Sequence, residues 1–316
     1  MRILITGGTG SLGHKLTAHL LANGAERIVI YSRDEYKQSQ MQKEYPDKRM
    51  RFFLGDVRDE ERLIKALKGV DTVIHAAALK RVNQLEYNPG ECLKTNVLGT
   101  TVVINACIKT QVEKAVFLST DKSVAAINIY GLSKAMAERL WLDACFYKPI
   151  FRVTRYGNVM GSRGSVLELY RDLCAKGKKE LPLTNPGMSR FWTSFDQAIG
   201  IIELALAGLP HMIYVPKARA FSMTNLIAAF GKRARFIGIR PGEKYAETLI
   251  HEYEMPRTRD MGDHYQIRPE IPYDDEIEWP IGEVVSEPLS SEAPDMTIGE
   301  IRRLLDADTV CQAVNK

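Results

Sequence analysis

Thr120, Asp121 and Lys122 place a hydroxyl, a carboxyl and an amine next to one another, and Tyr130 and Lys134 follow within a short stretch of chain. Residues spaced i, i+4 share one face of a helix, so Tyr130 and Lys134 can act on the same bound molecule. A tyrosine hydroxyl titrates near pH ~10, and a nearby ammonium lowers that pKa because it stabilises the phenolate. The pair therefore predicts a general base for an alcohol proton. The competing interpretation is an ordinary surface pairing, since this spacing is common.

These residues follow a segment with the pattern of a buried strand. The segment of residues 114–119 is short and mostly apolar, which predicts a buried strand. Thr120, Asp121 and Lys122 then lie at the carboxyl end of this strand. Open α/β sheets bind ligands at that edge. We therefore expect the three side chains to face a ligand. For Asp121 and Lys122 the alternative is a solvated surface ion pair.

The N-terminus shows a strand, a glycine-rich loop and a helix in the order that dinucleotide-binding units use. Glycines permit a tight turn and a close approach of the backbone to a pyrophosphate, which then rests on the amides that begin the helix. A fold that has lost its cofactor and serves as a binding module is the alternative. The cofactor contacts expected in this loop are Gly7, Thr9, Gly10, Ser11, Leu12 and Gly13.

The second predicted strand, residues 27–31, ends in side chains that bear on the choice of cofactor. A carboxylate there suits the ribose 2′-hydroxyl of NAD, whereas an arginine suits the 2′-phosphate of NADP. Ser32, Arg33 and Lys37 favour NADP over NAD, while Asp34 is equally placed to cap the next helix.

The next two strands add further expected cofactor contacts. Asp56 and Val57 follow the third strand and are expected to meet the adenine. His75 ends the fourth strand and is predicted to be a packed residue without a chemical role. The small residues after it let the backbone pass close to the cofactor; they are Ala76, Ala77 and Ala78.

Alternating strands and helices indicate an α/β fold, a Rossmann-type doubly wound parallel sheet with a smaller mixed α/β substrate-binding lobe. The NADP-binding domain is expected over residues 1–158, with a returning strand near 211–216. Residues 159–316 are expected to form mainly the substrate-binding lobe and a C-terminal extension.

Three segments have individual predictions. Helices are expected over residues 91–107 and 298–305. Residues 269–300 are rich in Asp, Glu and Pro, which predicts irregular wrapping or an edge strand.

The composition excludes several classes of protein. The 316 residues include 43 Lys and Arg against 39 Asp and Glu, without a basic block interleaved with aromatic residues, so we expect no nucleic acid partner. The five cysteines form no Cys-x-x-Cys pair, which predicts no metal site and a reducing cytoplasm. No apolar run is long enough to span a bilayer and no signal peptide is evident, so we expect no membrane association.

The sequence blocks together resemble the extended short-chain dehydrogenase/reductase family. The glycine-rich loop and the Tyr130 and Lys134 pair carry this wider resemblance. Rarer blocks narrow it to the inverting UDP-N-acetylglucosamine 4,6-dehydratases of the pseudaminic acid type, from residue 1 to about residue 250. These blocks are Tyr31-Ser32-Arg33-Asp34-Glu35, Gly55-Asp56-Val57-Arg58-Asp59, His75-Ala76-Ala77-Ala78-Leu79-Lys80, Ser119-Thr120-Asp121-Lys122, Arg155-Tyr156-Gly157-Asn158-Val159, Gly161-Ser162-Arg163-Gly164-Ser165 and Gly238-Ile239-Arg240-Pro241-Gly242-Glu243-Lys244.

The resemblance implies a three-stage reaction on a UDP-sugar: oxidation at C4, loss of water across C5 and C6, and return of the hydride to C6. It implies that Tyr130 is the base on the C4 hydroxyl, that Lys134 holds the nicotinamide ribose, and that Thr120 hydrogen-bonds the C4 oxygen. Asp121 is then expected to protonate the departing C6 hydroxyl, and Lys122 to work at C5, where reprotonation on the opposite face inverts the centre.

The resemblance also implies a set of substrate contacts. Arginines suit a diphosphate because the guanidinium fork donates two charge-assisted hydrogen bonds. Asn96 is expected to have a structural or relay role. The expected substrate contacts are Lys80, Asn158, Arg163, Thr184, Met188, Arg190, Arg240 and Glu243, and a plain surface position is the alternative for each.

The role of Lys122 carries a physical condition, because an ammonium cannot accept a proton. Lowering the pKa of a lysine from about 10.4 to about 7 costs on the order of 5 kcal/mol, which burial and nearby positive charge can supply. Asp121 opposes this shift unless it is itself protonated. The alternative is that Lys122 donates the proton that completes inversion at C5.

Other activities stay open at this point. A retaining 4,6-dehydratase or a UDP-sugar 4-epimerase is the main alternative, although an epimerase needs no acid–base pair at C5 and C6. A non-catalytic NADP-sensing protein is the remote one, since it need not keep Tyr130 and Lys134. The resemblance further implies a homo-oligomer, either a dimer or a larger assembly up to a hexamer.

Overall fold

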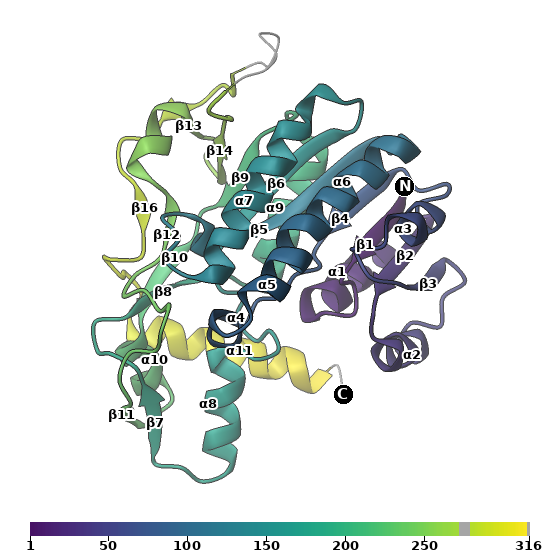
Figure 1. Cartoon of the computed structure of the whole chain (residues 1–316). Coiled ribbons are helices and arrows are strands. Elements are labelled where there is room, and N and C mark those ends of the chain that lie inside the picture. The colour runs from purple at the N-terminus through teal and green to yellow at the C-terminus, as the bar shows by residue number, and fades with distance from the viewer. Residues whose placement is uncertain (272–278, 315–316) are drawn as a thin grey trace.

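A ten-stranded sheet runs through the molecule, with helices on both faces (Figure 1). The structure is a computed structural model that describes residues 1–271 and 279–314. The strand order is β15-β13-β14-β9-β6-β5-β4-β1-β2-β3, and each neighbouring pair from β9 to β3 is parallel. The parallel strands are β1 (Arg2–Thr6), β2 (Arg27–Ser32), β3 (Met50–Leu54), β4 (Thr72–His75), β5 (Lys114–Thr120), β6 (Ile150–Tyr156) and β9 (Ile213–Pro216). The predicted Rossmann-type α/β fold is confirmed.

The apolar strands are buried because helices cover both faces of the sheet. One core lies between the sheet and α1 (Ser11–Ala22), α2 (Glu35–Glu44) and α9 (Phe195–Ala207). A second core lies on the opposite face, under α3 (Glu60–Ala66), α6 (Gly99–Thr110) and α7 (Ile129–Asp143). The carboxyl ends of the parallel strands therefore meet at one edge, between two covered faces.

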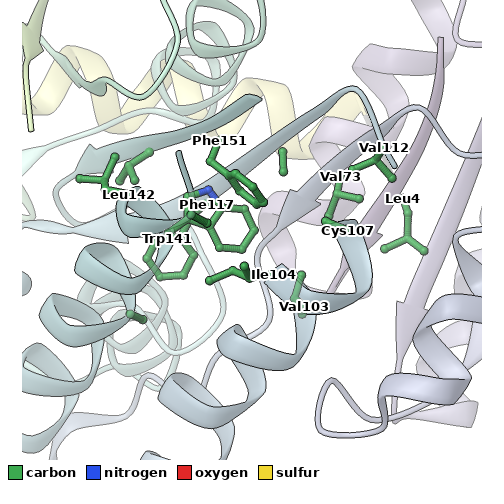
Figure 2. Close-up of a cluster of buried hydrophobic side chains, with 14 of the residues drawn as sticks. Leu4, Val73, Val103, Ile104, Cys107, Val112, Phe117, Trp141, Leu142 and Phe151 are labelled. Carbon is green, nitrogen blue, oxygen red and sulfur yellow. The ribbon is translucent and has the colours of Figure 1, made fainter. Parts of the chain in front are cut away.

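Aromatic rings fill the second core beneath α7 (Figure 2). Trp141 stacks on Phe117 with ring centroids 5.4 Å apart, and Phe151 meets its ring edge-on. His75 also stacks on Trp141, and its two ring nitrogens contact the hydroxyls of Thr6 and Thr100. Burial lowers the pKa of His75 to about 3, so this histidine is neutral and packed, as the sequence predicts.

The helix predicted over residues 91–107 has a more complex form. It comprises α5 (Pro89–Cys92), a π-helical stretch (Leu93–Leu98) and α6, which ends three residues later than predicted at Thr110. Gln111 stops it there with a left-handed φ of 55°. A π-helical stretch accommodates extra residues in a helix and is frequent at functional sites.

The returning strand also starts later than predicted, at Ile213 rather than near residue 211. His211 has a φ of 59°, which is incompatible with an extended strand. Its amide instead donates to the carbonyl oxygen of Phe151, 3.0 Å away, and the chain becomes extended two residues later.

The second half of the chain extends the same sheet. Antiparallel strands β14 (His264–Ile267), β13 (Thr258–Asp260) and β15 (Glu283–Val284) follow β9. The prediction of an edge strand in the acidic segment is thus confirmed by β15, and β16 (Leu289–Ser290) pairs with β12 (Thr248–Ile250). The rest of that prediction falls partly on residues 272–278, outside the described residues. Because the sheet reaches well past residue 158, the two-domain division stays a prediction.

A separate lobe has its own apolar core around Tyr170, Phe221 and Leu226. Its helix α11 extends to Val314 instead of ending at the predicted residue 305. Figure 1 shows α11 crossing the lower half of the view beside α8 and α10. The lobe contains α8 (Val166–Ala175), β7 (Glu180–Leu183), β8 (Ser189–Trp192), β10 (Arg219–Ser222), α10 (Met223–Ala229), β11 (Arg233–Phe236) and α11 (Ile298–Val314). The remaining elements are α4 (Val82–Glu86) and the 3-10 turns η2 (Asp121–Ser123), η3 (Ala144–Phe146) and η4 (Glu252–Arg257).

A buried arginine links the sheet to α7 and η4. Arg155, on β6, lies 2.5 Å from Glu138 of α7 and 2.8 Å from Glu254 of η4. All three residues are buried. Removing one partner from such a group leaves an uncompensated charge in the interior, which is costly.

We expect Arg155→Met to lower the free energy of unfolding by about 3–5 kcal/mol, because Glu138 loses its buried cation and Glu254 keeps only Arg257, 3.4 Å away. Urea denaturation measures this change. Adding Glu138→Gln and Glu254→Gln to the same chain removes the stranded charges and should recover part of the loss. A loss below about 1 kcal/mol for the single variant, within the range of an ordinary substitution, contradicts the expectation.

Candidate active site

A cleft of about 810 Å³ opens at the carboxyl ends of β1, β4, β5 and β6, between the sheet and the lobe. Most of the site residues predicted from the sequence line this cleft. Chain segments that are far apart in sequence therefore meet there. These residues are Gly7, Gly10, Ser11, Leu12, Gly13, Ala76, Ala77, Ala78, Lys80, Thr120, Lys122, Tyr130, Lys134, Asn158, Arg163, Thr184, Met188, Arg190, Arg240 and Glu243. Seven predicted residues do not line it: Thr9, Ser32, Arg33, Lys37, Asp56, Val57 and Asp121.

The glycine-rich loop has the geometry of a dinucleotide cradle. A Cβ atom on Gly13 would lie 2.0 Å from the carbonyl oxygen of Gly8, and one on Gly7 would lie 2.8 Å from the Cα of Ala77. Gly10 caps α1 without a side-chain hydrogen bond, and the first turn of α1 holds no acidic residue. The helix start therefore keeps positive potential and amide donors for a diphosphate. These features fit a bound dinucleotide.

Lys122 is surrounded by three oxygen atoms at the centre of the cleft. Its Nζ donates to Oδ1 of Asp121 at 3.0 Å and to Oδ1 of Asn158 at 2.9 Å. Oε1 of Glu247 lies 3.1 Å away. Thr120 also donates its hydroxyl to Oδ1 of Asp121, at 2.9 Å. Thr120, Asp121 and Lys122 thus form one connected group, and Asp121 is fully buried.

The charge state of Lys122 differs from what a base requires. Burial favours loss of its proton, but Asp121 and Glu247 outweigh burial and raise the pKa of Lys122. In the ligand-free protein Lys122 is therefore an ammonium. The condition that its pKa falls toward 7 is not met in this state, because the fold places two carboxylates beside Nζ where the sequence predicted one.

Tyr130 and Lys134 lie on α7 and both line the cleft. The predicted lowering of the Tyr130 pKa is wrong for the ligand-free protein, because burial raises it to about 12. Lys134 does not act on Tyr130 in this state. Its Nζ donates to the carbonyl oxygen of Leu118 at 2.6 Å and lies 3.7 Å from the centre of the Phe117 ring. Burial lowers the pKa of Lys134 to about 7.

The end of β2 holds paired charges beside the glycine-rich loop. Asp34 accepts a hydrogen bond from the amide of Lys37 at 3.0 Å and so caps α2, as the sequence allowed. Arg33 lies 3.3 Å from the carboxylate of Asp56, and its side chain is half exposed. Lys37 lines a second hollow of about 220 Å³, outside the main cleft.

Two of the residues predicted to bind the cofactor are held within the fold. The hydroxyl of Ser32 contacts the side-chain amide of Gln38 at 3.0 Å. Val57 packs in the core and offers no side chain to the cleft. Any contact from Val57 to a cofactor would therefore come from its backbone.

Asn96 has the structural role that the sequence favoured. Its side-chain oxygen accepts from the amide of Leu79 at 2.8 Å, and its side-chain nitrogen donates to the carbonyl of Leu79 at 2.9 Å and to Ser133 at 2.9 Å. Asn96 therefore fixes the loop that follows β4 against α7, which carries Tyr130.

Arg163 lies on the cofactor side of the cleft, not among the other predicted substrate contacts. Its amide donates to the hydroxyl of Ser11 at 2.9 Å, and its guanidinium donates to the carbonyl oxygen of Thr9. The loop after β6 is thus fastened directly onto the glycine-rich loop, and its position suits a phosphate bound there.

The remaining predicted substrate contacts form one wall of the cleft. Arg190 donates to the carbonyl oxygens of Ser189 at 2.6 Å and Lys244 at 3.0 Å. Arg240 and Glu243 are linked through the Arg240 amide, which donates to Glu243 at 3.2 Å. The hydroxyl of Thr184 contacts the sulfur of Met188 at 2.8 Å. Lys80 lies exposed at the rim.

Glu247 was not among the residues predicted from the sequence. It lines the cleft, and only 2% of its surface is exposed. It lies three residues beyond the last resembling block and immediately precedes β12. The available signal was a carboxylate directly before an apolar run. Buried acids are rare unless they are paired, so this position indicates a nearby cation.

The described residues contain neither a candidate metal-binding cluster nor a helix suited to a membrane. No group of His, Cys, Asp and Glu side chains among residues 1–271 and 279–314 is arranged to hold a metal ion. Over the same ranges, no helix has the length and apolar character that crossing a membrane requires.

Comparison with known sequences identifies a family. Residues 3–269 match the family model described as polysaccharide biosynthesis protein, which reaches beyond the expected limit near residue 250. A UDP-N-acetylglucosamine 4,6-dehydratase (inverting) of Campylobacter jejuni (strain 81-176) is 44% identical over 280 residues, 85% of this chain and 83% of the relative. A UDP-glucose 4-epimerase of Rickettsia canadensis is 41% identical over 280 residues, 84% of this chain and 82% of the relative.

Solved structures agree with the fold. The X-ray structure of Pen from Bacillus thuringiensis has a TM-score of 0.89 at 31% identity and covers 98% of both chains. DesIV, a dTDP-glucose 4,6-dehydratase from Streptomyces venezuelae crystallised with NAD, has a TM-score of 0.71 at 25% identity, over 78% of this chain and 87% of DesIV. The predicted resemblance to short-chain dehydrogenase-type nucleotide-sugar enzymes is therefore confirmed, and the chain belongs to the polysaccharide biosynthesis protein family.

Proposed function

We propose that the protein is a UDP-N-acetylglucosamine 4,6-dehydratase that inverts C5 and releases UDP-2-acetamido-2,6-dideoxy-beta-L-arabino-hex-4-ulose. One observation carries this proposal: the connected group of Asp121, Lys122 and Thr120 lies in the same cleft as Tyr130. An acid–base pair beside an alcohol-oxidising tyrosine matches a reaction that both oxidises C4 and removes water. The 44% identical inverting dehydratase supports the same conclusion.

The cleft suits a nicotinamide dinucleotide, and the NAD-containing structure of DesIV supports this class of cofactor. When bound, the nicotinamide accepts a hydride from C4 and later supplies one to C6. We propose that the glycine-rich loop holds the diphosphate, that Ala76, Ala77 and Ala78 border the nicotinamide, and that Lys134 holds its ribose. We further propose NADP over NAD, because Arg33 and Lys37 place two cations beside the loop and Asp34 is occupied as a helix cap.

The first half of the reaction belongs to α7 and the end of β5. We propose that Tyr130 takes the proton from the C4 hydroxyl and that Thr120 donates a hydrogen bond to the C4 oxygen. A pKa of about 12 makes the ligand-free tyrosine a poor base. The positive charge of the oxidised nicotinamide and a charged Lys134 favour the phenolate, so Tyr130 becomes a base only in the loaded cleft.

The second half belongs to η2. The 4-ketone acidifies the C5 proton, after which Asp121 protonates the departing C6 hydroxyl and Lys122 exchanges the proton at C5. Asp121 is fully buried, and one of its carboxyl oxygens has no hydrogen-bond partner among the described residues. That oxygen is therefore the atom from which Asp121 is proposed to deliver a proton.

The substrate contacts follow the charges of the cleft wall. We propose that Asn158, Arg190, Arg240 and Glu243 contact the UDP-sugar, together with Lys80, Thr184 and Met188. Arg163 is proposed to contact phosphate next to the glycine-rich loop. We also propose a cytoplasmic homo-oligomer, in which exposed Leu132 and Met136 of α7 provide apolar surface for a second subunit.

A UDP-sugar 4-epimerase is the second candidate, because the Rickettsia relative carries that name at 41% identity. An epimerase shares the need for Tyr130, Thr120 and Lys134. It has no use for an acid–base pair at C5 and C6, so the buried Asp121 and Lys122 group favours the dehydratase. A retaining dehydratase differs only in the face of C5 that receives the proton.

The product formed in D₂O separates these activities. With UDP-N-acetylglucosamine and the dinucleotide-loaded protein, we expect NMR to show a 6-deoxy-4-keto sugar with solvent deuterium at C5, the L-arabino configuration and no net release of reduced cofactor. A C4 epimer as the sole product contradicts the dehydratase, and a D-xylo product contradicts inversion.

Lys122→Ala should separate the two halves of the reaction. We expect this variant still to reduce the bound nicotinamide, seen by absorbance, but to lose dehydration by at least about 100-fold, the usual contribution of an acid–base group. Tyr130→Phe is the matched variant for the first half and should slow both steps. Normal dehydration by Lys122→Ala contradicts the assigned role.

The cofactor preference depends on Arg33. Charge-assisted hydrogen bonds contribute about 1.5–3 kcal/mol, so Arg33→Ala should weaken NADP binding by about 10-fold or more and leave NAD binding nearly unchanged. Isothermal titration of both dinucleotides measures the difference. Arg51→Ala removes an exposed arginine from the neighbouring strand and serves as the control. An equal loss of affinity for both dinucleotides contradicts the 2′-phosphate contact.

A further inference from the structure

Glu247 is a buried carboxylate whose position is fixed before any ligand binds. Its amide donates to the hydroxyl of Ser291, and the amide of Ser291 donates to its carbonyl oxygen, both at 2.9 Å. Ser291 itself is fully buried. The carboxylate therefore faces the cleft from a backbone that is tied on both sides, and its position does not depend on a mobile loop.

The strongest contact of this carboxylate is with Lys122. Oε1 lies 3.1 Å from Nζ of Lys122 and 4.0 Å from Nε of Arg190. Oε2 lies 3.8 Å from Nζ of Lys244 and has no hydrogen-bond partner among the described residues. Arg190 and Lys244 donate hydrogen bonds to backbone carbonyl oxygens instead, and Lys244 donates to that of Val124 at 2.6 Å. Lys122 is therefore the cation that Glu247 engages directly.

The Lys122 ammonium carries three protons. It donates hydrogen bonds to Asp121 and Asn158, and the Glu247 carboxylate lies 3.1 Å from Nζ as its ion-pair partner. Lys122 must release one of these protons before it can remove one from C5. The Asn158 amide oxygen is too weak a base to keep it. Asp121 is already required to carry the proton for the C6 hydroxyl. Glu247 is the acceptor that remains.

We propose that Glu247 is the proton partner of Lys122: it takes a proton from the ammonium before elimination, and it returns that proton once the one that Lys122 takes from C5 has passed to Asp121, which has given its own to the C6 hydroxyl. In this step the bond between Nζ and one proton breaks, and an O–H bond forms on Oε1 of Glu247. The ion pair becomes a neutral amine and a neutral carboxylic acid, so no charge leaves the site. Lys122 can then accept the C5 proton, while Glu247 holds the displaced one. The inference rests on the proposed dehydratase activity.

Filling the cleft provides the driving force for this transfer. A bound substrate excludes water, and a dry site disfavours an ion pair relative to its neutral form. The groups that face Lys122 are Asp121 from η2, Glu247 and Lys244 from the segment before β12, Arg190 from β8 and Tyr130 from α7. Arg190 opposes a positive charge at Nζ, so it favours transfer toward Glu247.

Glu247→Gln tests the partnership first in the ligand-free protein. Lysine side chains labelled with ¹⁵N report the titration of each amine by NMR, and the signal of Lys122 is identified by its absence in Lys122→Met. We expect Glu247→Gln to lower the pH midpoint of the Lys122 signal, because one of the two carboxylates that hold its proton is gone. An unchanged midpoint overturns the inference, whichever sugar the enzyme uses.

The pH profile of dehydration provides the second test. In the wild-type protein the proton stays within the pair, whereas in Glu247→Gln it must leave to solvent. We therefore expect a loss of about 100-fold near neutral pH that diminishes as the pH rises, since higher pH deprotonates Lys122 directly. Glu247→Asp should restore part of the rate at neutral pH. The control is Glu252→Gln, an exposed carboxylate on η4.

Two results would overturn the role of Glu247: a wild-type rate in Glu247→Gln, or a reduced rate that is equally low at every pH and is not restored by aspartate. The second result indicates a structural role. Failure of the wild-type protein to make a 6-deoxy-4-keto sugar instead contradicts the proposed function, and the NMR titration then decides whether Glu247 controls the Lys122 proton.

Discussion

Burial of a parallel sheet on both faces is the constraint on which the site depends. Parallel strands are joined by crossover connections, and the helices in these connections cover both faces of the sheet. Each connection returns the chain to the same edge, so that the next strand runs in the same direction. The segments after β1, β4, β5 and β6 therefore emerge side by side, and the glycine-rich loop, the alanine run and the Thr120 to Lys122 group share one cleft. Arg155 adds a second restraint, because it fixes α7 to β6 from within the core.

Charge compensation explains how this cleft tolerates so many ionisable groups. Lys122 lies between Asp121 and Glu247, and Arg190 and Lys244 surround the same carboxylate. Buried charges of this kind persist because each has an opposite partner within a few ångströms. The same closeness lets a proton move between partners without a net change of charge. The stability of the site and its reactivity thus have a common physical origin.

Much of this arrangement could be predicted from the sequence, because it depends on local pattern. Six of the seven parallel strands, the glycine-rich loop and the helix cap by Asp34 follow from apolar runs, turn residues and capping residues close together in the chain, whereas β6 was not predicted. Tyr130 and Lys134 were recognisable by their spacing. The family resemblance supplied the chemistry of Asp121 and Lys122, which spacing alone leaves ambiguous.

The parts that escaped prediction depend on contacts between distant segments. Glu247 meets Lys122 only because the segment before β12 folds back over η2, so the raised pKa of Lys122 was not foreseeable. The pKa of Tyr130 was predicted in the wrong direction because burial in the assembled cleft exceeds the effect of nearby cations. Strand β9 begins later than predicted because His211 has a left-handed φ, which no residue pattern in the sequence indicated.

Lys134 makes the affinity for the dinucleotide depend on pH. Its amine is buried against Leu118 and Phe117, and with a pKa of about 7 it is charged in only about half of the molecules at neutral pH. Ribose hydroxyls that accept hydrogen bonds from this amine would favour its charged form. Loading the cleft above neutral pH therefore draws a proton from solvent, so that the affinity for the dinucleotide declines as the solution becomes alkaline.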